Sequence, residues 1–204
     1  VNTKSIYIWF NKTKGNKMNL EVVKEQFKKL KMFKSSKELD EILIKNKKAI
    51  DLSWLSEVLE AELDYRNEVS IQRRILNAQF PELRSLEQFN WGFNPKIPKE
   101  RIKELATLNF IEKNEIGLFL GNPGTGKTHI AISIGMLAAR YGYKVYCTSV
   151  KRLTKKILAA KKENTLDSLF KKILTSKLWI LDDWGVVSMN RDVSEEIFDL
   201  FDRR

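Results

Sequence analysis

The fold is decided by one stretch of the sequence, Gly121-Asn122-Pro123-Gly124-Thr125-Gly126-Lys127-Thr128. An apolar run at 116–120 precedes it, and a helical pattern from Thr128 to about Tyr141 follows it. This is the strand–GxxxxGK[ST]–helix order of a phosphate-binding P-loop. Glycines permit the tight turn that points successive backbone N–H groups at phosphate oxygens, and the helix start adds a positive dipole end. The alternative, a glycine-rich turn with an incidental lysine, fits the flanking patterns poorly.

Two P-loop side chains have further roles in triphosphate chemistry. The ammonium of Lys127 reaches the β- and γ-phosphates, and the hydroxyl of Thr128 ligates Mg²⁺. We therefore predict that residues 121–128 bind ATP, that Lys127 also belongs to the catalytic residues, and that Thr128 belongs to the metal site.

A second apolar run, LWIL at 178–181, ends in two carboxylates, Asp182 and Asp183. Parallel strands buried on both faces are continuously apolar, and ligands bind at their carboxyl ends. We predict that Asp182 holds Mg²⁺ and that Asp183 orients or deprotonates the attacking water. The alternative is that the two acids only begin a solvated loop.

Composition limits the classes of protein to consider. The 204 residues are 43% hydrophobic, enough for a medium domain with a smaller appendage. No apolar stretch approaches the roughly 18 residues of a membrane span, so we expect no membrane association. A single cysteine, Cys147, excludes an internal disulfide and favours a cytoplasmic location. Cys147 lies in an apolar segment, where we interpret it as core filling.

The positive charge is concentrated near the N-terminus. Residues 1–48 hold 13 Lys against 5 Asp and Glu, a balance of +8, which leaves +3 of the total +11 for the other 156 residues. Such a basic segment favours binding to double-stranded DNA. The alternative is that lysine and asparagine are abundant because the genome is rich in A and T.

The patterning along the chain divides it into four parts. We expect an unstructured leader at 1–17 with Met18 as the natural start, a basic helical domain at 18–80, a linker at 81–99, and an α/β P-loop domain at 100–204. The helical domain includes a capping box of Ser35 and Glu38 and a long helix over 53–79. In the linker, the aromatic residues either cover the adenine or pin the linker to the domain; these are Phe89, Trp91 and Phe93.

The long helix carries Arg66, Arg73 and Arg74, whose spacings of seven and eight place them on roughly one face. Phosphate contact is one interpretation of this face. A solvated face paired with Glu62 and Glu68 is the other, and the patterning favours it.

The linker, the P-loop and the strand that ends in Asp182 and Asp183 together make the chain resemble a known family. It resembles the IstB-like helpers of insertion-sequence transposition. These are AAA+ ATPases related to the DnaC-type loaders of the replicative helicase. The resemblance covers about Met18 to the end and is carried by four segments: FNWGFNPKIP at 89–98, LATLNFIE at 105–112, GNPGTGKTHIAISIG at 121–135, and LWILDDWG at 178–185.

The resemblance implies an AAA+ domain that binds ATP and Mg²⁺ and self-associates into a ring or spiral on double-stranded DNA. The assembly deforms the duplex and presents it to a partner transposase. A basic helix over 151–162 is implied to line the DNA path, although a solvated lysine face has the same pattern. Its candidate DNA-binding residues are Lys151, Arg152, Lys155 and Lys156.

The resemblance also implies segments beyond Arg204. Family members continue into a strand with a polar sensor residue, which lies between the P-loop strand and the strand of Asp182, and then into helices that carry an arginine finger. We therefore expect a truncated product with two strands that lack neighbours. Such an arginine accelerates phosphoryl transfer roughly 10³–10⁵-fold in related enzymes. Without it, we expect weak ATP binding and negligible ATP hydrolysis.

Two other functions stay open from the sequence. A DnaC-type helicase loader has the same chemistry with a helicase as partner, and the linker segment argues against it. A catalytically inert DNA- or partner-binding fragment belongs to another class and would bind DNA without regard to nucleotide.

Overall fold

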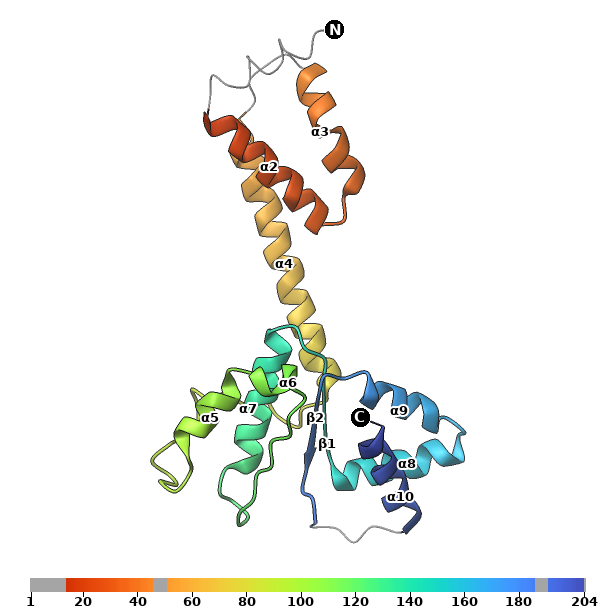
Figure 1. Ribbon diagram of the computed structural model, residues 1–204. Coiled ribbons are helices and arrows are strands. Elements are labelled where there is room, and N and C mark those ends of the chain that lie inside the picture. The colour runs from red at the N-terminus through yellow and green to blue at the C-terminus, as the bar shows by residue number, and fades with distance from the viewer. Residues whose placement is uncertain (1–13, 46–50, 186–190, 204) are drawn as a thin grey trace. The chain divides into compact units, whose positions relative to one another are not determined.

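The computed structural model describes residues 14–45, 51–185 and 191–203, and of residues 14–19 the backbone alone (Figure 1). The chain forms two compact units, Val1–Ser70 and Ile71–Arg204, which divide within helix α4 (Ser53–Ala78). Helix α2 (Lys14–Lys29) begins four residues before Met18. Of the predicted leader, residues 1–13 lie outside the described residues.

The first unit contains helices α2, α3 (Phe33–Lys45) and the first part of α4. Leucines and other apolar residues at helical spacing form its core. The buried members are Leu20, Val23, Phe27, Leu30, Leu39, Leu52 and Leu59. The predicted capping box of Ser35 and Glu38 is wrong, because α3 begins at Phe33 and places Ser35 inside the helix.

Helix α4 begins where the sequence predicts, at Ser53, but the capping side chain is Asp51. The carboxylate of Asp51 accepts hydrogen bonds from the backbone N–H of Ser53 at 2.9 Å and from its hydroxyl at 2.8 Å. These bonds lower the pKa of Asp51. An aspartate that caps a helix start is stabilised by the unpaired N–H groups of the first turn.

The second unit contains a parallel two-stranded sheet, as an α/β fold requires. Strand β1 (Val145–Ser149) pairs with β2 (Leu178–Asp182) in a register that sets Val145 opposite Leu178 and Ser149 opposite Asp182. Helices α8 (Val150–Lys162) and α9 (Leu166–Leu174) connect the two strands. Both strands therefore end at the same edge of the sheet.

Side chains alternate between the two faces of this sheet. Val145, Cys147 and Ile180 face helix α7 (Lys127–Arg140), which covers one side. Tyr146 and Trp179 face the opposite side, where α8, α9 and α10 (Arg191–Asp202) form the second layer (Figure 1). Helices α5 (Lys99–Ala106) and α6 (Asn109–Glu112) precede the P-loop.

The expected strand at 116–120 is not formed. No strand pairs with these residues in the part of the chain that the structure describes, since β1 and β2 pair only with each other. Ile116, Leu118 and Leu120 are 91%, 76% and 82% exposed, while Phe119 packs against the core. Exposed and packed side chains alternate along this segment in part as they do in a strand. A strand is defined, however, by backbone hydrogen bonds to a neighbouring strand.

The predicted linker contains no helix or strand between α4 and α5, yet it is packed rather than loose. A Cβ added at Gly135 of α7 would meet the ring of Phe80 at 2.8 Å and Ile180 at 2.5 Å. Phe89 is 7% exposed and belongs to the core of the second unit. The glycine at 135 therefore lets β2 and Phe80, the residue just before the linker, approach the P-loop helix closely.

Candidate nucleotide-binding site

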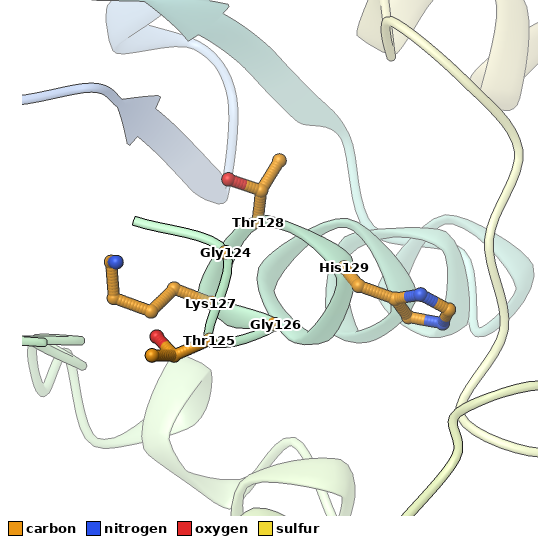
Figure 2. Close-up of a pocket in the computed structure, with 6 residues that line it drawn as sticks. All are labelled: Gly124, Thr125, Gly126, Lys127, Thr128 and His129. Atoms are coloured by element: carbon orange, nitrogen blue, oxygen red, sulfur yellow. The ribbon is translucent and has the colours of Figure 1, made fainter. Parts of the chain in front are cut away.

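The P-loop turns through three glycines with positive φ, which are +151° at Gly121, +76° at Gly124 and +91° at Gly126. Gly126 is the N-cap residue directly before α7, and the pocket beside it is lined by residues 124–129 (Figure 2). A side chain would strain these conformations, so the glycines are needed for the turn itself. The resulting loop leads into the N-terminus of a 14-residue helix, as phosphate binding requires.

The side chain of Lys127 forms hydrogen bonds with the backbone of its own P-loop. Its ammonium donates to the carbonyls of Gly121 and Asn122, both at 2.8 Å, and Thr125 donates its hydroxyl to Asn122 O at 2.9 Å. Figure 2 shows Lys127 and Thr125 leaving the loop on the same side. The lysine is thus held over the loop, where phosphate oxygens would replace the two carbonyls as acceptors.

The hydroxyl of Thr128 meets the carboxylate of Asp182 at the end of β2. The oxygen of Thr128 lies 2.9 Å from Oδ2 and 3.1 Å from Oδ1 of Asp182. The sequence predicts both residues as metal ligands, and the structure brings them together from segments 54 residues apart. A hydroxyl and a carboxylate are hard oxygen donors of the kind that Mg²⁺ binds.

Asp183, the predicted water-orienting residue, is exposed and has a φ of +58°. Its backbone N–H donates to Oδ1 of Asp182 at 3.0 Å. Aspartate is among the non-glycine residues that adopt this left-handed conformation most readily. The carboxylate of Asp182 therefore accepts hydrogen bonds from the backbone of Asp183 as well as from Thr128.

The linker forms a wall behind the P-loop. The ring of Phe89 contacts Gly126, where an added Cβ would lie 2.7 Å from it, and stacks edge-on with His129 at 5.1 Å and Trp91 at 4.9 Å. His129 points away from Lys127 (Figure 2), and its Nε2–H donates to Ser85 O at 3.0 Å.

Phe89 has one of the two roles predicted for the linker aromatics, because its burial in the core attaches the linker to the domain. Phe93, in contrast, is 67% exposed. The sequence gives no sign of the contact between Phe89 and Gly126. His129 directly follows Thr128, and this adjacency in the sequence is the only signal of its place beside the pocket.

The arginines of α4 have different surroundings. Arg66 donates to Glu62 at 2.6 Å and to Leu30 O at 3.3 Å. Arg74 is half-buried and donates through Nε to Ala139 O at 2.7 Å, in the last turn of α7. Arg73 is exposed. The pairing of Arg66 with Glu62 matches the solvated-face interpretation, while Arg74 satisfies a carbonyl at a helix end.

The basic residues of α8 also divide into two kinds. Lys151, Arg152 and Lys155 are exposed. Lys156 is half-buried and donates to Gln79 Oε1 and to the hydroxyl of Tyr146, the latter at 2.9 Å. Burial and the nearby charge of Arg152 lower the pKa of Lys156.

Cys147 is 2% exposed in β1, as its interpretation as core filling predicts. Burial, with a smaller contribution from the charge of Asp182, raises the pKa of its thiol to about 11. The thiol is therefore uncharged at neutral pH and has no nucleophilic character there.

A parallel sheet, a glycine-rich loop that opens a helix, and an acidic residue at the end of the adjacent strand together define a P-loop nucleotide-binding protein. The chain belongs to the family of IstB-like ATP-binding proteins, whose family model matches residues 25–204.

Proteins of insertion sequences are among its similar relatives. The chain is 35% identical over 151 residues to the ATP-binding protein of insertion sequence IS21 from Pseudomonas aeruginosa, covering 74% of this chain and 57% of the relative. It is 34% identical over 151 residues to that of IS5376 from Geobacillus stearothermophilus, covering 74% and 60%. It is 34% identical over 143 residues to that of IS232 from Bacillus thuringiensis subsp. berliner, covering 70% of this chain and 57% of the relative. The matched segments thus span less than two thirds of these relatives.

Among the helices that the structure describes, none is both long and apolar enough to cross a membrane.

Proposed function

We propose that this chain is the ATP-binding helper of an insertion-sequence transposition system. In this proposal it binds double-stranded DNA as a self-associated ring or spiral controlled by ATP, and it presents target DNA to a partner transposase. The cytoplasm is the proposed location. The membership in the IstB-like family and the insertion-sequence names of the relatives support the proposal.

The single observation that carries the nucleotide part is the contact between Thr128 and Asp182. A glycine-rich loop alone occurs in many turns. Here the hydroxyl of Thr128 lies within hydrogen-bonding distance of the carboxylate of Asp182 at the end of β2. A hydroxyl and a carboxylate are the two side-chain types that hold Mg²⁺ in P-loop proteins. We infer that Thr128 and Asp182 would hold Mg²⁺ and that the backbone of residues 121–128 would hold the phosphates of ATP.

We propose roles for two further side chains of this site. The ammonium of Lys127, already beside the loop, supplies positive charge for the β- and γ-phosphates. Asp183 lies one residue beyond the metal-binding carboxylate, and we propose that it orients the attacking water. Bound Mg²⁺ would supply charge neutralisation between the phosphates.

Charge supports the DNA part of the proposal. The sequence has a net charge of +11, and DNA backbones attract such proteins at any sequence. Bending a duplex costs several kcal/mol, which an assembly of subunits with many phosphate contacts would offset.

The test is DNA binding by the purified chain in three nucleotide states. Fluorescence anisotropy of a labelled duplex is measured with Mg²⁺ and ATP, with Mg²⁺ and ADP, and without nucleotide, at two salt concentrations. Lys127→Ala is compared with Lys113→Ala, which removes the same charge at an exposed position outside the loop. We expect ATP to strengthen DNA binding in the parent chain and in Lys113→Ala but not in Lys127→Ala. Equal affinity in all three states would identify a DNA-binding fragment that ignores nucleotide.

A further inference from the structure

Three cationic side chains gather around one tyrosine on the second unit. Tyr146 of β1 is 1% exposed, and its hydroxyl accepts a hydrogen bond from Lys156 of α8. The ammonium groups of Lys156 and Lys172 lie 5.1 and 5.8 Å from the centroid of its ring. Arg152 precedes Lys156 by one helical turn, the spacing at which helical side chains are neighbours.

Among the residues that the structure describes, the charges in this cluster have no acidic partner. Within residues 14–45, 51–185 and 191–203, none of the three cations forms an ion pair with a carboxylate. Elsewhere on α8, by contrast, Lys161 pairs with Glu196 at 2.6 Å. Like charges at close range oppose one another, and an aromatic ring face offsets only part of this repulsion. A bound anion would neutralise the remaining repulsion among the three cations.

The exposure of the three side chains is graded. Arg152 and Lys172 are exposed, whereas Lys156 is half-buried between Tyr146 and Gln79. Burial and the charge of Arg152 lower the pKa of Lys156, and the charges of Lys172 and Arg152 oppose the rise in the pKa of Tyr146 that burial causes. The cluster therefore has a hydrogen-bonded ammonium at its base and two exposed cations at its rim.

We propose that Arg152, Lys156 and Lys172 form a binding site for one backbone phosphate of double-stranded DNA, built between helices α8 and α9. This inference rests on the proposed DNA-binding function and deepens it, because it selects two members of the basic helix and adds a residue of α9. Lys151, Lys155 and Lys171 contribute only to the general positive field. Since the contact is to phosphate, it is independent of base sequence.

The chain contains a matched control for each rim residue. Lys151 and Lys171 are exposed and directly precede Arg152 and Lys172 in the sequence. The double variant Arg152→Gln/Lys172→Gln therefore removes the same charge from the same two helices as Lys151→Gln/Lys171→Gln. Lys156 is left unchanged because its hydrogen bonds also hold the local packing.

The experiment measures anisotropy of a labelled duplex with the 204-residue chain over a range of salt concentrations, with ATP and Mg²⁺ present. Thermal unfolding confirms that both double variants are folded. We expect Arg152→Gln/Lys172→Gln to weaken binding and to reduce the slope of log Kd against log salt by about 1 to 2, since each lost phosphate contact reduces it by about 1. The control variant should retain the parent slope.

Equal losses in the two double variants would overturn the site while leaving the proposed function intact, because only the general field would then be acting. Unchanged binding in both variants would overturn it as well. Absence of DNA binding by the parent chain at low salt would refute the DNA part of the proposed function and the site with it.

Discussion

The hydroxyl of Thr128 lies 2.9 Å from the carboxylate oxygen Oδ2 of Asp182, so the start of the P-loop helix and the end of β2 meet at one point. The contact connects the first turn of α7 to a strand that the sheet holds in register with β1. It brings the two oxygen donors of the proposed metal site within hydrogen-bonding distance of each other. Several measurable consequences follow for binding and stability.

Mg²⁺ should strengthen ATP binding through both residues of this contact. Thr128→Val removes the hydroxyl and keeps the shape, and Asp182→Asn removes the charge. We expect each variant to lose the Mg²⁺-dependent part of ATP affinity, measured by titration calorimetry with Mg²⁺ and with a chelator. The double variant should lose no more than either single one, since both side chains act on one ion. Additive losses would contradict a shared site.

Gly126 should tolerate substitution less well than Gly124. Both have positive φ, +91° and +76°, so alanine costs each about 1–2 kcal/mol of backbone strain. At Gly126 a Cβ would also lie 2.7 Å from Cε2 of Phe89, whereas at Gly124 nothing lies within 4 Å. We expect Gly126→Ala to cost about 1–3 kcal/mol more, measured by urea unfolding. Equal costs would show that Phe89 does not hold the linker against the loop.

Arg74 should stabilise the C-terminal turn of α7. Its Nε–H donates to Ala139 O at 2.7 Å, and a hydrogen bond from a charged group contributes about 1.5–3 kcal/mol. Arg74→Ala should therefore speed amide hydrogen exchange in the last turn of α7. Arg73→Ala removes the same charge from an exposed neighbour and serves as the control. Equal exchange rates in the two variants would refute the capping role.

Much of the second unit is predictable from local patterns. Helix α8 begins one residue before the expected span of 151–162 and ends with it, and β2 covers the apolar run at 178–181 together with Asp182, because each has its own hydrophobic period and end signals. The pairing of Thr128 with Asp182 follows from the rule that ligands bind at the carboxyl ends of parallel strands.

The remaining features depend on contacts between distant residues. The segment at 116–120 has the composition of a strand, but strand formation needs a neighbour that local sequence does not reveal. Arg74 looks like an exposed basic residue until the packing of α7 brings Ala139 to it, 65 residues away. Lys172 lies on a different helix from Arg152, so their common tyrosine is visible only in the fold.

The stability of the second unit should fall between about pH 9 and pH 11. The pKa of Cys147 is raised from its ordinary value of 9.0 to about 11, so the unfolded chain releases the thiol proton first as pH rises. The resulting loss is about 2–3 kcal/mol, complete once pH exceeds the folded-state pKa. Cys147→Ala should remove this part of the pH dependence in unfolding measurements across that range. Parallel pH profiles for the parent chain and the variant would contradict the prediction.

The most direct test of nucleotide binding at the P-loop is the affinity of the chain for ATP with Mg²⁺, measured by calorimetry beside Lys127→Ala and Lys113→Ala. The ammonium that now bonds Gly121 O and Asn122 O is expected to bind phosphate instead. The parent chain and Lys113→Ala should bind ATP alike, while Lys127→Ala should bind at least about tenfold more weakly, a loss of about 1.4 kcal/mol. Equal ATP affinity in all three proteins would show that the nucleotide does not bind at the P-loop.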